Sequence, residues 1–132
     1  MKKGYYVPIE ARTRDNTDFR HVLYTGSHMQ LVLMTLQPGE DIGMEVHEDN
    51  DQFFRFEEGE GNVVINDSEY SVGDGDVIIV PAGSQHNIIN TGEGMLKLYT
   101  IYAPAHHKDG IVRATKADAM AHEAEFDGVT TE

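Results

Sequence analysis

Short runs of apolar residues separated by turn-forming residues fill the middle of the chain. "HMQLVLMTL" (28–36) ends at a Pro-Gly turn, and "DQFFRFEEGEG" (51–61), "VIIVPAG" (77–83) and "MLKLYTIYAP" (95–104) are of the same kind. No helical period separates these runs, and short strands bounded by Gly, Pro and Asn are typical of β-sandwiches and barrels. The pattern predicts an all-β fold of about eight or more short strands rather than an α/β fold.

Two details of the strand pattern give sharper predictions. Asn66 and Asp67 stand between two strand-like runs, which indicates a β-hairpin turn. The run that ends at Pro81 is uniformly apolar and predicts a buried strand. Along 95–104 we expect Tyr99 and Ile101 to pack in the interior of the fold.

The two ends of the chain differ from the middle. Residues 1–20 are polar with weak alternation and predict an N-terminal strand or arm, followed by the barrel over 21–114. In the segment 115–132, Thr115 is a candidate N-cap with an acid, Asp118, three positions on, which predicts a short helix and then a tail. We expect the last residues, "DGVTTE", to fray.

Composition narrows the classes of partner. The formal net charge of -13 disfavours nucleic acid and anionic membranes as partners. The chain has no cysteine, so a metal site must use His, carboxylate or amide ligands. No stretch is apolar enough for a signal peptide or a membrane span, and we expect a cytoplasmic location.

The stretch "GMEVHEDNDQFF" (43–54) carries the first candidate chemistry. Glu45 and His47 are two residues apart, so on a strand they point to the same face. Their Cα atoms would then lie about 6.6 to 7 Å apart, a common separation for two ligands of one ion. Gln52 follows at the start of the next predicted strand.

A second stretch, "GDGDVIIVPAGSQHNIIN" (73–90), completes a resemblance to a known family. The second cupin motif is Gly, five residues, Pro-x-Gly, two residues, His, three residues and Asn. Its positions are occupied without a gap by Gly75, Pro81, Gly83, His86 and Asn90. The chain thus resembles small single-domain cupins, often labelled mannose-6-phosphate isomerase-like, and the resemblance implies a jelly-roll (double-stranded β-helix) barrel.

The first cupin motif matches with substitutions. Gly39, His47 and Gly59 align with it, but Glu45 replaces the first His and Gln52 replaces the Glu. The resemblance therefore implies a metal set of Glu45, His47, Gln52 and His86. The usual cupin set and this set each contain one carboxylate, at different positions of the motif, so the charge of the ligand set is unchanged.

Two imidazoles and one carboxylate suit a divalent ion such as Fe, Mn, Zn, Ni or Cu. Gln52 would be a neutral oxygen ligand or a group that orients a bound water. The alternative is a site without metal, in which the two His residues line a cavity and Glu45 meets water at the barrel mouth.

Three functions follow from these alternatives. The first is a metal-dependent isomerase or oxygenase acting on a small polar metabolite such as a sugar or keto acid, with Glu45 or a loop His, of which we name His107, moving protons. The second is a non-catalytic module that binds a small molecule. The third is a structural role. In each case we expect a homodimer, paired through aromatic-rich strands and the N-terminus.

Overall fold

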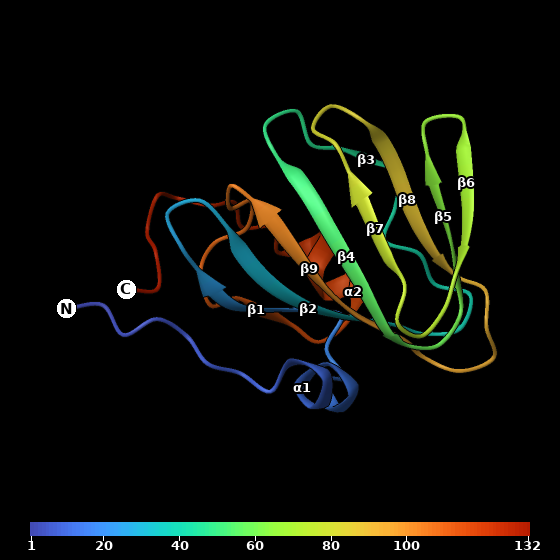
Figure 1. The fold of residues 1–132 in the computed structure, drawn as a ribbon, viewed down its shortest axis with the longest axis horizontal. Coiled ribbons are helices and arrows are strands. Elements are labelled where there is room, and N and C mark those ends of the chain that lie inside the picture. The colour runs from blue at the N-terminus through green and yellow to red at the C-terminus, as the bar shows by residue number, and fades with distance from the viewer.

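The computed structural model describes residues 1–132 as two packed antiparallel sheets (Figure 1). One sheet has six strands in the order β10-β1-β2-β9-β4-β7, and the other has four in the order β3-β8-β5-β6. The predicted all-β jelly roll is confirmed. The strands are β1 (Arg20–Thr25), β2 (Gln30–Leu36), β3 (Glu45–Val46), β4 (Asp51–Glu58), β5 (Gly61–Ile65), β6 (Ser68–Val72), β7 (Val77–Val80), β8 (Gln85–Asn90), β9 (Leu96–Ala103) and β10 (Val112–Arg113).

The core lies between the sheets and is built by alternation along the strands. On β4, Phe54 and Phe56 point inward, and on β9 Leu96 and Leu98 do the same. These side chains are at most 1% exposed, and burial of apolar area of this size is the main stabilising contribution to a domain of this length.

The hairpin between β5 and β6 confirms the turn predicted at Asn66-Asp67. Ile65 pairs with Ser68, which leaves a two-residue loop. Asn66 has φ 50°, a left-handed conformation that Asn tolerates better than most residues.

Two predictions about which side chains are buried are wrong. Strand β7 has one face on the core and the other on the outer face of the six-stranded sheet, so Ile79 is 63% exposed and only alternate residues are buried. On β9 the inward positions belong to Thr100 and Tyr102, and Tyr99 and Ile101 lie on the outer face. Both faces of β9 carry apolar residues, so periodicity alone does not fix which one faces the core.

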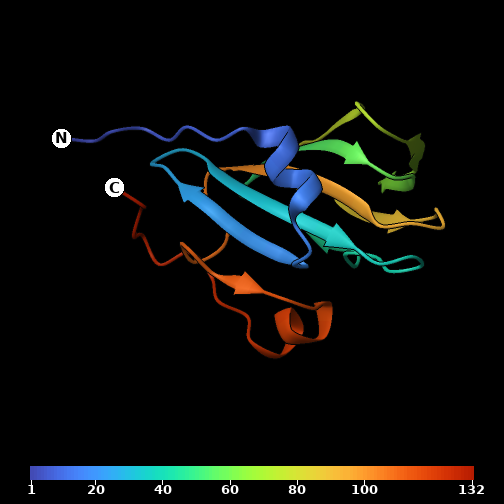
Figure 2. The same ribbon diagram turned by 90° about the horizontal axis from the view of Figure 1, so that it is seen from below.

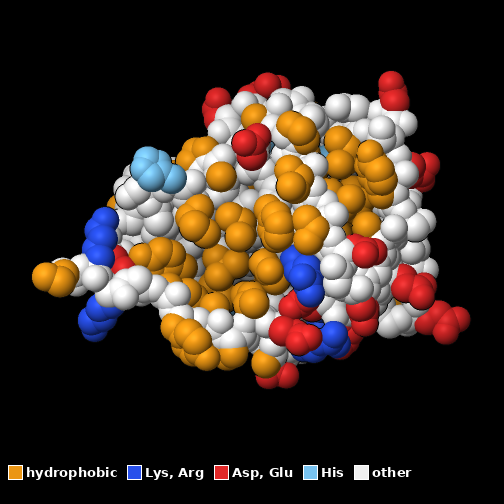
Figure 3. All heavy atoms as spheres, in the orientation of Figure 1, with side chains coloured by type: hydrophobic (Ala, Val, Ile, Leu, Met, Phe, Trp, Pro, Cys, Tyr) orange, Lys and Arg blue, Asp and Glu red, His pale blue; other side chains and the backbone are white.

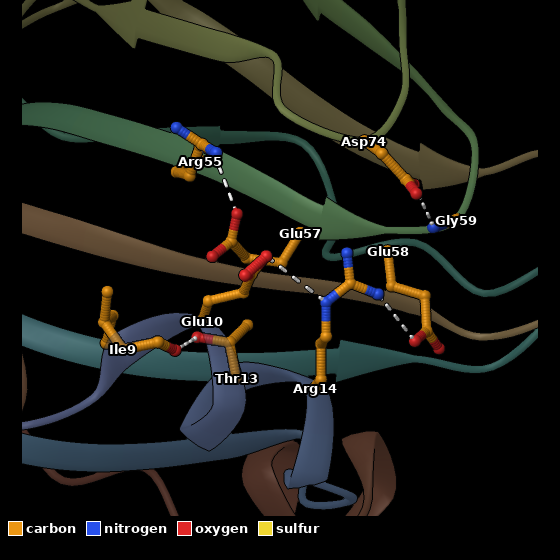
Figure 4. Close-up of polar contacts among 9 residues, drawn as sticks. All are labelled: Ile9, Glu10, Thr13, Arg14, Arg55, Glu57, Glu58, Gly59 and Asp74. Atoms are coloured by element: carbon orange, nitrogen blue, oxygen red, sulfur yellow. Dashed lines mark hydrogen bonds and ion pairs between the residues drawn. The ribbon is translucent and has the colours of Figure 1, made fainter.

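The N-terminal region is not a strand. Residues Ile9–Asp15 form helix α1, in which the Thr13 hydroxyl donates a hydrogen bond to the Ile9 carbonyl at 2.7 Å. The Arg14 guanidinium lies between Glu10 of the helix and Glu58 of β4 (Figure 4). The helix packs on the outer face of the six-stranded sheet, because tertiary contacts outweigh the weak alternation of this segment.

Helix α2 (Lys116–Ala121) confirms the predicted cap, since the Thr115 side chain accepts a hydrogen bond from the Asp118 amide. It lies on the opposite side of the six-stranded sheet from α1 (Figure 2). The tail lies against β1, where Thr131 exchanges hydrogen bonds with Thr25. Neither helix has the length and apolar character needed to cross a membrane.

Candidate metal centre

The side chains of Glu45, His47 and His86 converge at one end of the space between the sheets. Glu45 of β3 and His86 of β8 are directly opposite each other in the antiparallel pair. His47 follows β3, and its Nε2 atom lies 3.0 Å from a Glu45 carboxylate oxygen. One ligand atom from each residue lies within 4.8 Å of the other two. The structure therefore contains a candidate His/Glu metal site.

His86 is held in the tautomer that a metal needs. Its Nδ1–H donates to the Ser84 carbonyl at 3.0 Å, which leaves Nε2 with a free lone pair. His86 is 3% exposed, and its Nε2 is buried without a hydrogen-bond partner. Burial lowers the pKa of His86 below its ordinary value, so the ring is neutral and able to coordinate.

Gln52 approaches from the facing sheet. Its amide nitrogen donates to the Thr100 hydroxyl at 3.0 Å, and its Oε1 oxygen is buried without a partner. A buried acceptor without a donor costs free energy unless a bound ion, water or ligand satisfies it. Two such atoms, from Gln52 and His86, are what an ion or its bound water would satisfy, so the donor set fits a divalent metal.

Glu45 remains ionised in this setting. Burial raises the pKa of its carboxyl group. The hydrogen bond and charge of His47 and the charge of Arg20 together lower this pKa by more, so the net shift is downward. The side chain is 32% exposed, so the carboxylate also faces solvent. An ionised carboxylate beside two imidazoles is a common ligand set for a catalytic transition metal.

The motif glycine and asparagine that surround His86 have structural roles. Gly83 adopts φ +82°, and its amide donates to the His47 carbonyl at 2.9 Å, which ties the turn before β8 to the second candidate ligand. Asn90 is 1% exposed and its amide donates to the carbonyls of Leu36 and Gly94. The spacing of the motif thus fixes the position of His86 and His47.

The loop that carries His106 and His107 is anchored by buried amides. Gln30, fully buried at the start of β2, accepts from the backbone amides of both residues and donates to the His107 carbonyl. Asn50 donates to the carbonyls of Pro104 and Ala105. The loop is therefore part of the rigid frame of the site.

The two loop histidines have different surroundings. The ring of His106 lies 4.3 Å from that of His47, centroid to centroid, and stacks on Tyr102 at 5.3 Å. His107 is buried with its Nε2 3.1 Å from the Tyr102 hydroxyl. Burial, and then the charge of Arg20, lower the pKa of His107 to about 2, so it is neutral. His106 contacts a candidate ligand, whereas His107 bonds to Tyr102 and lines a cavity together with Glu45; its role in proton transfer stays a prediction.

Sequence reasoning did not single out four residues that frame the site. They are Arg20, Gln30, Thr100 and Tyr102. Each is an isolated polar residue in or beside an apolar strand. Only Gln30 and Thr100 can be recognised in the sequence, as polar residues that interrupt the inward-facing apolar positions of a strand.

Two of the cavities beside the centre share His106. One, of about 320 Å³, is lined by His47, Asn50 and Phe126 among others. The other, of about 100 Å³, is lined by Arg20, Glu45 and the loop histidines. The segment after α2 forms a wall of both cavities, where the Phe126 amide donates to the His106 carbonyl.

Known proteins carry the same fold and sequence features. The family model of the cupin domain matches residues 32–102, which include all four predicted ligands. The chain is a cupin. Many cupins bind metal, and this cupin carries a candidate His/Glu site where its family motifs meet.

Relatives of this cupin cover most of its length. It is 49% identical to the protein YrkC of Bacillus subtilis (strain 168) over 127 residues, 92% of this chain and 68% of YrkC. It is 44% identical to protein L612 of Acanthamoeba polyphaga mimivirus over 110 residues, 80% of this chain and 69% of that protein. The crystal structure of BH2720 from Bacillus halodurans superposes with a TM-score of 0.89 at 47% identity, covering 91% of this chain and 96% of that one.

Proposed function

We propose that this cupin holds one divalent metal ion through Glu45, His47 and His86 and acts on a small polar metabolite such as a sugar or keto acid. The observation that carries the proposal is the buried, unpartnered Nε2 of His86, whose tautomer is fixed by the Ser84 carbonyl. Gln52 supports it, because its free Oε1 is buried in the same space between the sheets.

The ion would supply Lewis acidity toward a carbonyl, carboxylate or enediol oxygen. The chain's own groups would do the rest. Glu45, ionised and partly open to solvent, is the group able to take up a proton, and the buried Tyr102, 5.7 Å from His47 between ring centroids, limits water. Sugar or keto-acid isomerisation and oxygenase chemistry both suit this ligand set, and turnover under air and under nitrogen separates them.

Metal analysis of protein purified without chelator or added metal tests the proposal. We expect about one equivalent per chain in the wild type and none in His47→Ala/His86→Ala. The matched control is His28→Ala, because His28 is an exposed histidine outside the site and its loss should leave the metal content unchanged. Wild-type protein that takes up no Fe, Mn, Zn, Ni or Cu would contradict the proposal.

A second candidate function, a structural role with a homodimer as the working unit, is favoured by one surface. Hydrophobic side chains gather over the outer face of the six-stranded sheet (Figure 3). There Phe53 and Tyr99 pack at 6.2 Å between ring centroids, and Val77 and Ile79 are 44% and 63% exposed. A second copy of the chain could cover this apolar face without bringing the many carboxylates of the two chains into contact with each other.

Size-exclusion chromatography with light scattering tests the dimer. We expect a dimer mass for the wild type and a monomer for Ile79→Glu, which places a charge at the exposed edge of the face. Glu93→Gln, on an exposed turn away from the sheet, is the control. A wild-type monomer at all concentrations would exclude the dimer and leave the metal proposal untouched.

A further inference from the structure

An arginine outside the family motifs points into the candidate site. Arg20 begins β1 and lines the cavity of about 100 Å³ together with Glu45, His106 and His107. It also lines the adjacent cavity of about 340 Å³ between β3 and α2. Arg20 is thus the cation shared by the two spaces that border Glu45.

Arg20 is an incompletely satisfied cation. Its guanidinium carbon lies 5.4 Å from the centroid of the Phe19 ring, but it makes no ion pair, and its Nε atom is buried without a hydrogen-bond partner. A guanidinium offers five N–H donors in a planar fork that matches a carboxylate. Leaving such a donor buried and unpaired costs free energy, which a bound anion would recover.

The charge of Arg20 acts on the whole site. It helps to lower the pKa values of His106 and His107, where burial is the larger effect in the same direction, and it helps to lower the pKa of Glu45 against the effect of burial. Arg20 also lines one cavity with all three, so a ligand bound there can meet each of them. Glu45 does not satisfy it, because no Arg20–Glu45 contact falls within ion-pair distance.

The rim of the cavity selects among anions. Glu123 and Glu125 are exposed on the segment that walls the cavity, so a dianion such as phosphate would meet two carboxylates. The cavity, of about 100 Å³, has room only for a small ligand. Both features favour a small monoanion.

We propose that Arg20 is the specificity residue of this site and binds the carboxylate of a small monocarboxylate metabolite, a 2-oxo or 2-hydroxy acid, that lies beside Glu45 and His106. The inference rests on the proposed metal function, since the ligand's second oxygen would face the metal ligands. It narrows the substrate class from small polar metabolites to those with a carboxylate next to an oxygen.

Calorimetric titration of pyruvate into protein loaded with Zn²⁺ tests the inference, with metal content measured first on every sample. We expect Arg20→Gln to weaken pyruvate binding by about ten- to a hundredfold, as for loss of a charge-assisted pair, with metal content unchanged. Arg20→Lys should recover part of the affinity, because it keeps the charge but not the fork. Arg12→Gln is the matched control, since Arg12 lies on α1, across the six-stranded sheet from the cavity.

Two ligand controls sharpen the outcome. Methyl pyruvate, which lacks the carboxylate charge, and inorganic phosphate should both bind more weakly than pyruvate to the wild type. Any one of four results would overturn the inference. Arg20→Gln could bind pyruvate as tightly as the wild type does, or the metal-loaded wild type could fail to bind pyruvate at all. The wild type could also bind methyl pyruvate as tightly as pyruvate, or bind phosphate more tightly than pyruvate. If the wild type takes up no metal, the proposed function is overturned instead. The metal content of each sample therefore distinguishes failure of the proposed function from failure of the inference about Arg20.

Discussion

The space between the two sheets has an apolar half and a polar half, built from the same strands. On β4, Phe54 and Phe56 lie in the apolar half and Gln52 in the polar half. On β9, Leu98 belongs to the first and Tyr102, whose hydroxyl meets His107, belongs to the second. Gln52, Phe54, Leu98 and Tyr102 are all at most 4% exposed, so at these positions the difference is one of chemistry and not of exposure.

The comparison separates stability from function. In the apolar half each buried side chain adds hydrophobic stabilisation and leaves no polar atom to satisfy. In the polar half, Gln52 and His86 are also buried, but His86 Nε2 and Gln52 Oε1 have no partner within the chain. Such atoms lower stability, so we infer that the polar half is kept for what it binds.

The largest expected effect is in the apolar half. Phe56 is fully buried, and Phe56→Ala should lower the free energy of unfolding by about 3–5 kcal/mol, because it removes a large side chain and leaves a cavity. Urea denaturation followed by circular dichroism measures the loss. A cost below about 1 kcal/mol would mean that this half is not the main source of stability.

The polar half should respond in the opposite way. Gln52→Met keeps the volume but removes the unpartnered Oε1, so metal-free protein should lose less than about 1 kcal/mol or gain stability. Metal affinity should fall by about tenfold, whether the oxygen binds the ion or orients its water. Competition with a chelator measures the affinity. A large loss of stability with unchanged metal affinity would assign Gln52 to packing alone.

The same contrast explains what the sequence could predict. Apolar runs and turn residues predict the strands and the hairpin at Asn66, and motif spacing brings Glu45, His47 and His86 into one group. The spacing works because it encodes structure: the Gly83 amide binds the His47 carbonyl.

The remainder depends on contacts between segments far apart in sequence. Arg20 lines one cavity with Glu45 and the loop histidines only once β1 and the segment after α2 are in place. Helix α1 forms against β4, as the Arg14–Glu58 pair illustrates, and the tail is held by β1 through Thr131. No local pattern reports such contacts, and both faces of β9 are apolar, so its inward side could not be chosen from periodicity.

The buried His107 makes the polar half sensitive to acid. Its pKa is about 2 in the folded chain and ordinarily 6.5, so between these values the unfolded state binds a proton that the folded state does not. Stability from this group is therefore complete above pH 6.5 and is lost as the pH falls toward 2. The slope is up to about 1.4 kcal/mol per pH unit.

Denaturation of metal-free protein at pH values from 7 to 4 tests this, with His107→Gln as the comparison, since glutamine does not titrate. The wild type should lose stability more steeply than the variant by up to about 1.4 kcal/mol per pH unit. Parallel slopes would mean that His107 is free to be protonated in the folded chain. It would then be better suited to proton transfer than its bond to Tyr102 implies.

The smallest expected effect concerns Thr100, which orients the Gln52 amide beside the candidate metal centre. Thr100 is fully buried and its hydroxyl accepts from the Gln52 amide, which leaves the Oε1 oxygen free within the buried space. Thr100→Val keeps the shape and removes this bond, at an expected cost of about 1 kcal/mol in unfolding free energy. Metal affinity should fall several-fold, because the amide can then rotate and present nitrogen in place of oxygen. In a Gln52→Met background the same change should leave metal affinity unaltered, since the group that Thr100 orients is already gone. An equal loss of affinity in both backgrounds would mean that Thr100 acts on the centre by a route other than Gln52.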